Sequence, residues 1–183
     1  MSVTAVKPAV GGAIKMAPLG TTLPTTADAT PAEAFAQLGY VSDSGLTRAI
    51  EMDTETVKAW GGDVVLVLHN SKVETFAYAL LDAHSVQVLK LVNGDNNVTG
   101  TALASGITVN SNNKDQPGHA FVIDMLEAGN TLHRIVIPNG ILTSLENITY
   151  VDTGAEAYGV TITAVADSAG NTCYEYFKTA AST

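Results

Sequence analysis

The chain has 183 residues, of which 46% are hydrophobic and only 15% are charged. This length fits one domain with a sizeable core, and the hydrophobic content excludes a mainly disordered chain. The net charge of −9 argues against a protein that grips nucleic acid by its phosphates, because such a surface needs a basic stripe. So few charges indicate a subunit whose surface is largely covered by other subunits.

The N-terminal segment, residues 1–30, is rich in Ala, Thr, Gly and Pro and has few large apolar side chains. We expect a flexible arm with one short strand at Ala13–Ala17, because this composition cannot form a core alone. A two-turn helix is predicted next. Thr30 fits its N-cap, Pro31 its first position, and Gly39 the position after its last turn.

From Leu46 the sequence alternates with a period of two, which is typical of a strand. One face of this strand is mainly apolar. The other face carries three acids, Glu51, Asp53 and Glu55, which we expect to face water or an aqueous channel.

Residues Glu55–Asp63 are predicted to form a long loop between two strands, with Trp60 between glycine-rich flanks. The following run, Val64–Leu68, is apolar on both faces. Such a run is typical of a strand that is buried between layers.

A second helix is predicted at Ala83–Val92, with Asp82 as its N-cap and Asn93-Gly94 as its stop. Short strands separated by turn residues account for most of the rest. These strands are Glu74–Leu81, Thr101–Val109, His119–Glu127, Leu132–Pro138, Ile141–Val151, Tyr158–Val165 and Tyr174–Phe177. The elements predict a mainly β fold, a β-sandwich or partly closed barrel with a flanking helix, in a single domain over residues 1–183. Its parts are the arm, residues 1–30, and the sandwich, residues 31–183.

Two triplets, Asp43-Ser44-Gly45 and Asp152-Thr153-Gly154, are similar to the paired loops of aspartic proteases. The two copies lie in dissimilar surroundings, and the chain is short for a two-lobed enzyme. Asp and Gly are also favoured turn residues, so we interpret both triplets as turns.

Four histidines, at positions 69, 84, 119 and 133, lack the spacing of a metal site. If His119–Glu127 and Leu132–Pro138 form a hairpin through Gly129-Asn130, His133 lies opposite Met125 or Leu126, far from His119. The lone Cys173 has no basic partner nearby in sequence and forms no intrachain disulfide. We therefore expect no enzyme activity, no metal and no cofactor.

No signal peptide or membrane-spanning run is apparent, so we expect a protein that is neither secreted nor bound to a membrane. The apolar run Val64–Leu68 is far shorter than the roughly 20 residues of a membrane helix.

Several stretches resemble the major tail proteins of long-tailed, siphovirus-type bacteriophages. In the first half these are Ala17–Pro24, Leu38–Gly45 and Lys58–Val65, and the strand Glu74–Leu81 before the helix at His84–Val92 continues the likeness. In the second half they are His133–Gly140, Ile148–Tyr150 and the closing strand Val160–Ala164. The resemblance covers essentially the whole chain through short motifs, without one sharp signature.

This resemblance implies a tail tube subunit that forms hexameric rings, which stack into a hollow tube around a tape-measure protein. It also implies initiator and terminator proteins at the tube ends, and DNA that leaves through the lumen. Subunit sheets would join into a continuous barrel, and the loop with Lys58, Trp60, Gly61, Gly62 and Asp63 would bridge stacked rings. The protein would reside in the virion tail and, during assembly, in the host cytoplasm.

The acids Glu51, Asp53 and Glu55 are our candidates for the lumen lining, where negative charge would let DNA slide without sticking. We expect residues 1–30 and 55–63 to be mobile in the free subunit and to order on stacking. Two other structural roles stay open, a capsid decoration protein and a tail-completion protein. A β-sandwich that binds carbohydrate or a receptor is disfavoured, because aromatic residues make up only 6% of the chain.

Overall fold

The computed structural model describes residues 5–8, 12–152 and 156–180. In these residues one antiparallel sheet of nine strands dominates. The strands are β1 (Val6–Pro8), β2 (Ile14–Pro18), β3 (Ala36–Gln37), β4 (Val41–Lys58), β5 (Val64–Leu80), β8 (His119–Glu127), β9 (Thr131–Leu145), β10 (Tyr158–Ala164) and β11 (Tyr174–Thr179). Between β5 and β8 lie α1 (Val86–Asn93), the 3-10 turns η1 (Asp95–Asn97) and η2 (Leu103–Ser105), and the small pair β6 (Val98–Thr99) and β7 (Thr108–Val109). The predicted mainly β fold with a flanking helix is confirmed.

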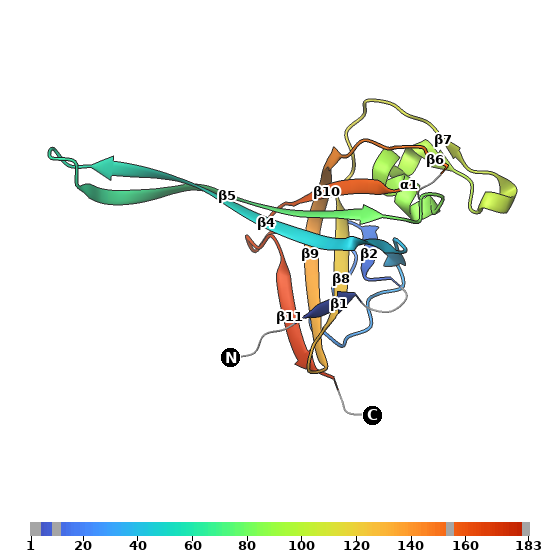
Figure 1. Cartoon of the computed structure of the whole chain (residues 1–183), viewed down its shortest axis with the longest axis horizontal. Helices are drawn as coiled ribbons and strands as arrows, with labels where there is room; N and C mark the ends of the chain where they lie inside the picture. The colour runs from blue at the N-terminus through green and yellow to red at the C-terminus, as the bar shows by residue number, and fades with distance from the viewer. Residues whose placement is uncertain (1–4, 9–11, 153–155, 181–183) are drawn as a thin grey trace.

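The sheet runs in the order β3-β2-β8-β9-β10-β5-β4 and does not close into a barrel. The long strand β9 organises it, because β8 follows one edge while β11 and then β10 share the other. Figure 1 shows β4, β5 and β10 crossing the direction of β8 and β9, so the sheet bends over on itself. The bend creates the space that the core fills.

Strand β8 is buried on both of its faces. Phe121 and Ile123 point into the main core, while Ala120 and Val122 point into a second cluster with Phe35. The main core also takes Phe76 and its neighbours from β5 and β10, and the helix α1 covers it with four buried side chains. We call this packed part of the molecule the body.

The far halves of β4 and β5 leave the body as a two-stranded ribbon, residues 50–73, which projects in Figure 1. Strand β10 pairs with β5 only along Glu74–Leu80, so Val64–Val73 has β4 as its one partner among the described residues. Every residue of the ribbon is exposed.

Two predictions about this region are wrong. Residues 55–63 are not a long loop, because β4 continues to Lys58 and a tight turn leads into β5. The run Val64–Leu68 is not buried within the chain, since its side chains are between 41% and 62% exposed. Cross-strand pairing extends the hairpin beyond the point where the core can cover it.

The predicted helix after Thr30 is also absent. A turn, in which the amide of Phe35 donates to Ala32 O at 2.9 Å, leads into β3 instead. Phe35 and Leu38 are buried, as the apolar pattern suggested, but they anchor different clusters. Tertiary burial therefore overrode the helix-start signals.

The N-terminal segment is less of an arm than expected. Ile14 and Ala17 of β2 are each 1% exposed, and β2 pairs with β8 inside the sheet. The predicted strand at Ala13–Ala17 is confirmed with a shift of one residue. The expectation for residues 1–4 and 9–11 lies outside the described residues.

The second helix is confirmed with a later start. It begins at Val86 with Ser85 as its N-cap, and it ends before Gly94, whose amide donates to Lys90 O at 2.8 Å. The Asp82 carboxylate accepts from the amide of Tyr40 at 3.3 Å, and so serves a neighbouring segment rather than the helix.

Several strand bounds differ from prediction. Residues 101–109 contain a 3-10 turn and only the two-residue β7, and the strand from Ile141 ends at Leu145. The predicted turn at Asn139-Gly140 is instead the middle of β9. Glycine is needed there for close packing, because a Cβ at Gly140 would lie 2.7 Å from Ile162 and 2.8 Å from Phe121.

Candidate self-assembly site

The sheet layer formed by β4, β5, β10 and the end of β9 has two unlike faces. Phe76, Tyr78 and Leu80 of β5 point into the core, so the residues between them point the opposite way. Cross-strand register extends this second face over all four strands. In the body it consists mainly of small side chains, with Ile141 beside Thr163 as a larger one. The small residues are Thr47, Ala49, Thr75, Ala77, Ala79, Thr143, Ser144, Gly159, Thr161 and Thr163. We call it the smooth face.

The three candidate acids continue the smooth face onto the ribbon. Glu51 pairs with Val73, Asp53 with Ser71, and Glu55 with Leu68, and all three acids are exposed. The side-chain amide of Asn70 donates to Asp53 Oδ2 at 3.2 Å, beside a bulge in β5. The described strands β4, β5 and β10 place no Lys or Arg on this face.

The opposite face of the ribbon has a different character. It carries the exposed apolar residues Ile50 and Met52 together with the cations Lys58 and Lys72. The three acids thus share one side of the ribbon with exposed apolar residues such as Val73 and Leu68, whereas both cations lie on the other side. A two-stranded hairpin of this kind is marginal in water unless another surface covers it.

Both ends of this four-stranded layer carry unpaired backbone in the part of the chain that the structure describes. The outer edge of β4 has no neighbour. At the other end, β8 pairs with β9 only up to Gly140, so Ile141–Leu145 has one free edge. Free strand edges of this length are templates for pairing with another chain.

The ribbon ends in a tight turn that holds the other candidate residues. The amide of Ala59 donates to Asp63 O at 2.8 Å, and the amide of Gly62 donates to Ala59 O at 3.0 Å. Gly61 and Gly62 have φ of 145° and 97°, which favours glycine at both positions. The turn leaves the Trp60 side chain fully exposed. Lys58 and Asp63 flank this turn.

An ion-pair junction that sequence reasoning missed fixes the base of the ribbon. The guanidinium of Arg48 donates to Glu74 and to Glu175 of β11, and it lies 5.6 Å from the centre of the Phe76 ring. The Thr172 hydroxyl donates to Glu74 at 2.6 Å. The sequence signal for this junction is Arg48, which stands among the apolar positions of its strand.

The Glu74 carboxylate is 1% exposed. Burial acts to raise the pKa of Glu74, but hydrogen bonds from Thr172 and Arg48 outweigh it, and the net pKa is lowered. Burial also raises the pKa of the neighbouring Cys173 to about 11, so this thiol is protonated at neutral pH.

The remaining sequence candidates do not converge. His119 lies 3.2 Å from Asp95, whereas His133 stacks on Phe177 and pairs with Met125, as the hairpin prediction required. Within the described ranges, no group of three or more His, Cys, Asp or Glu is arranged to hold a metal ion. Thr153 and Gly154 of the second triplet lie outside the described residues.

No helix in the described part of the chain is both long and apolar enough to cross a membrane. The fold and its surfaces define a β-rich structural subunit with free strand edges and an exposed ribbon. The family model described as phage tail tube protein matches residues 2–182, and this chain belongs to that family. It is a structural subunit of a phage tail tube, a virion component that assembles with copies of itself, and the resemblance found in the sequence is confirmed.

Among solved structures, the chain is similar to one in the cryo-EM structure of an extracellular contractile injection system, the PVC sheath-tube complex in its extended state. The two are 11% identical, with a TM-score of 0.46, and the match covers 92% of this chain and 90% of the other. No curated protein matches the chain.

Proposed function

We propose that this protein, as one domain, forms closed rings that stack into a tube, with the smooth face lining a lumen through which DNA passes. The single observation that carries the proposal is a face with mainly small side chains in the body and three acids on the ribbon, bounded at both ends by strand edges that are free among the described residues. Six copies per ring is the number that the sequence resemblance implies.

Ring closure follows from the two free edges. The outer edge of β4 in one copy pairs with Ile141–Leu145 of β9 in the next, so that the four-stranded layers join into a continuous barrel. Closure removes the exposed edges that would otherwise promote aggregation.

The smooth face suits a conduit because its described part on β4, β5 and β10 has no Lys or Arg that could bind DNA phosphates. Thr, Ala and Ser side chains are short, and Glu51, Asp53 and Glu55 repel phosphate. At physiological ionic strength this repulsion reaches roughly 8 Å from the wall. DNA is therefore cargo that slides without binding, and the subunit is not an enzyme and uses no cofactor.

The partners are copies of this chain, a tape-measure protein inside the tube during assembly, and initiator and terminator proteins at its ends. Assembly takes place in the host cytoplasm. The tip residues Lys58, Trp60, Gly61, Gly62 and Asp63 contact an adjacent ring, because the ribbon carries them away from the body.

Negative-stain microscopy of the concentrated protein tests the tube directly, and hollow tubes with a regular axial repeat are expected. Cysteine cross-linking tests the ring edges. In a Cys173→Ser background, Ser144→Cys on β9 is combined in turn with Thr47→Cys, Ala49→Cys or Glu51→Cys on β4. One combination should give a ladder that ends at six subunits.

A ladder that ends at another number overturns the hexamer. Assembled tubes in which no combination cross-links overturn the β4–β9 contact. The lumen assignment is tested by replacing Glu51, Asp53 and Glu55 with Lys, which should leave tube formation intact and slow DNA release. The control replaces three exposed acids elsewhere, Glu33, Asp115 and Asp152, and should release DNA normally.

A further inference from the structure

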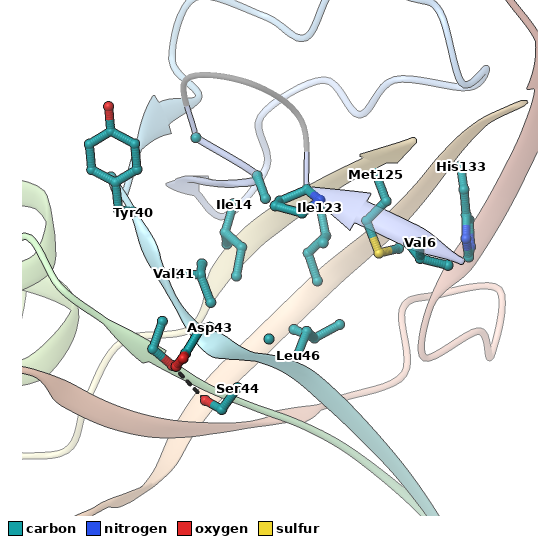
Figure 2. A pocket seen from close by; sticks show the side chains of 16 residues that line it. Val6, Ile14, Tyr40, Val41, Asp43, Ser44, Leu46, Ile123, Met125 and His133 are labelled. Carbon is teal, nitrogen blue, oxygen red and sulfur yellow. Dashed lines mark hydrogen bonds between the residues drawn. The ribbon is translucent and has the colours of Figure 1, made fainter. Parts of the chain in front are cut away.

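An apolar groove of about 800 Å³ opens on the body at the seam where the sheet does not close. One wall comes from the N-terminal strands and the other from the start of β4, and Figure 2 shows the side chains between them. We call it the seam groove. Its lining includes Val6, Ile14, Val41, Leu46, Ile123 and Met125.

The groove exists because β4 arches away from β5 at its start. Val41 pairs with Leu80 and Leu46 with Tyr78, so four residues of β4 stand opposite the single residue Ala79. Within the arch the Ser42 and Ser44 hydroxyls lie 2.5 Å apart, and Figure 2 shows Asp43 and Ser44 there. Since Ile14 and Ile123 belong to the main core, the groove is an opening into that core.

The chain carries one side chain suited to this opening, the fully exposed Trp60 at the ribbon tip. It is the only tryptophan in the sequence. A large aromatic side chain has only two rotatable bonds to immobilise, and such residues dominate the energetics of protein interfaces.

The tip does not reach the groove of its own chain. The groove lies beside Leu46 at the base of the ribbon, and Lys58 lies twelve positions further along the strand, a span of roughly 40 Å. A Trp60 that enters this groove must therefore belong to another copy. A knob and a groove at distant places on one chain make a head-to-tail contact that need not close, which is the geometry of a growing filament.

We propose that Trp60 of one copy inserts into the seam groove of the next copy along the tube axis. This rests on the proposed function and adds the receiving surface of the axial contact. One charge pair is complementary, because Lys58 lies on one side of the tip and the exposed Asp43 lines the groove, while Asp63 lies on the other side of the tip. The groove is large enough for an indole ring and apolar neighbours from the ribbon.

Tryptophan emission during polymerisation tests the insertion, because Trp60 is the sole source of that signal. Emission should shift to shorter wavelength as tubes form, while light scattering and microscopy follow assembly independently. Trp60→Ala should raise the critical concentration roughly 30-fold, as expected for loss of a central aromatic anchor. Tyr150→Ala, which removes another exposed aromatic ring, is the matched control and should assemble normally.

A charge exchange identifies the groove as the receiving surface. Lys58→Glu should weaken assembly by repelling Asp43, and adding Asp43→Lys should restore it. A disulfide between Trp60→Cys and Ser44→Cys chains, mixed in a Cys173→Ser background, should form on assembly. The exposed Ser168→Cys should not replace Ser44→Cys in that reaction.

The outcomes separate this inference from the proposed function. Tubes whose tryptophan emission stays unshifted, or in which only the Ser168 control cross-links, overturn the insertion and leave the tube intact. A blue shift without charge rescue and without the Ser44 cross-link means that Trp60 is buried elsewhere, against a tape-measure protein or another surface, and also overturns it. Absence of tubes under all conditions overturns the proposed function itself.

Discussion

Strands β4 and β5 pass through two regions with opposite environments. Along Glu74–Leu80 in the body, every second side chain of β5 is buried and the strand has neighbours on both edges. Along Val64–Val73 in the ribbon, the same strand is exposed on both faces and has β4 as its one neighbour in the described part of the chain. The apolar run Val64–Leu68 nevertheless has the composition of a fully buried strand. The sequence of Glu74–Leu80 therefore suits the folded chain, whereas the sequence of Val64–Val73 suits the assembly.

We expect the largest difference between body and ribbon in the hydrogen-exchange rates of their backbone amides. In the free subunit we expect amides of β8 at Ala120–Ile123 to exchange at least about a hundredfold more slowly than those of the ribbon, because ribbon opening breaks few buried contacts. In tubes the ribbon should become protected. The segment Ile14–Ala17 should be protected in both states, since β2 is part of the core sheet.

Equal protection of the ribbon and β8 in the free subunit would contradict the expected difference in local stability between ribbon and body. A ribbon that stays unprotected in assembled tubes would show that no copy covers it.

Side-chain truncation should separate the two regions in stability. Phe76→Ala removes a fully buried ring from the body and should lower the free energy of unfolding by about 3–5 kcal/mol. Leu66→Ala in the ribbon should change it by less than about 0.5 kcal/mol, because the side chain is already half exposed. Denaturant unfolding of dilute subunits measures both. Similar losses for the two variants would mean that the ribbon is part of the folding core.

The junction at Glu74 lies where the body meets the ribbon. Removing the Glu74 charge should lower the free energy of unfolding by less than Phe76→Ala does. Glu74→Gln should cost about 1–3 kcal/mol, because Arg48 and Thr172 lose a charged acceptor. The pKa of Glu74 is lower in the folded state than its usual 4.5, so its stabilisation is complete above that value. It is lost as the pH falls from 4.5 through the folded-state pKa.

Unfolding measured between pH 7 and pH 3 should therefore show a smaller acid loss for Glu74→Gln than for the natural chain. Glu33→Gln, at an exposed site, is the control and should retain the natural pH profile. An unchanged profile for Glu74→Gln would mean that the junction does not contribute to folding.

The sequence by itself determined the fold class, the helix near residues 86–93 and the alternation that puts Glu51, Asp53 and Glu55 on one strand face. These features depend on local pattern, because side-chain period and capping residues are read within about ten positions. It also allowed the family resemblance to be recognised, since short motifs recur along the whole chain.

Only the tertiary structure decided which strands meet and where the core ends. Thr30 and Pro31 start no helix because Phe35 and Leu38 are drawn into different clusters. The sequence of β5 does not mark the point at which β10 stops pairing with it, and so the sequence predicts a loop and a buried strand where the ribbon lies. The seam groove and the Arg48–Glu74–Glu175 junction join residues far apart in the chain, and such contacts depend on the bend of the whole sheet.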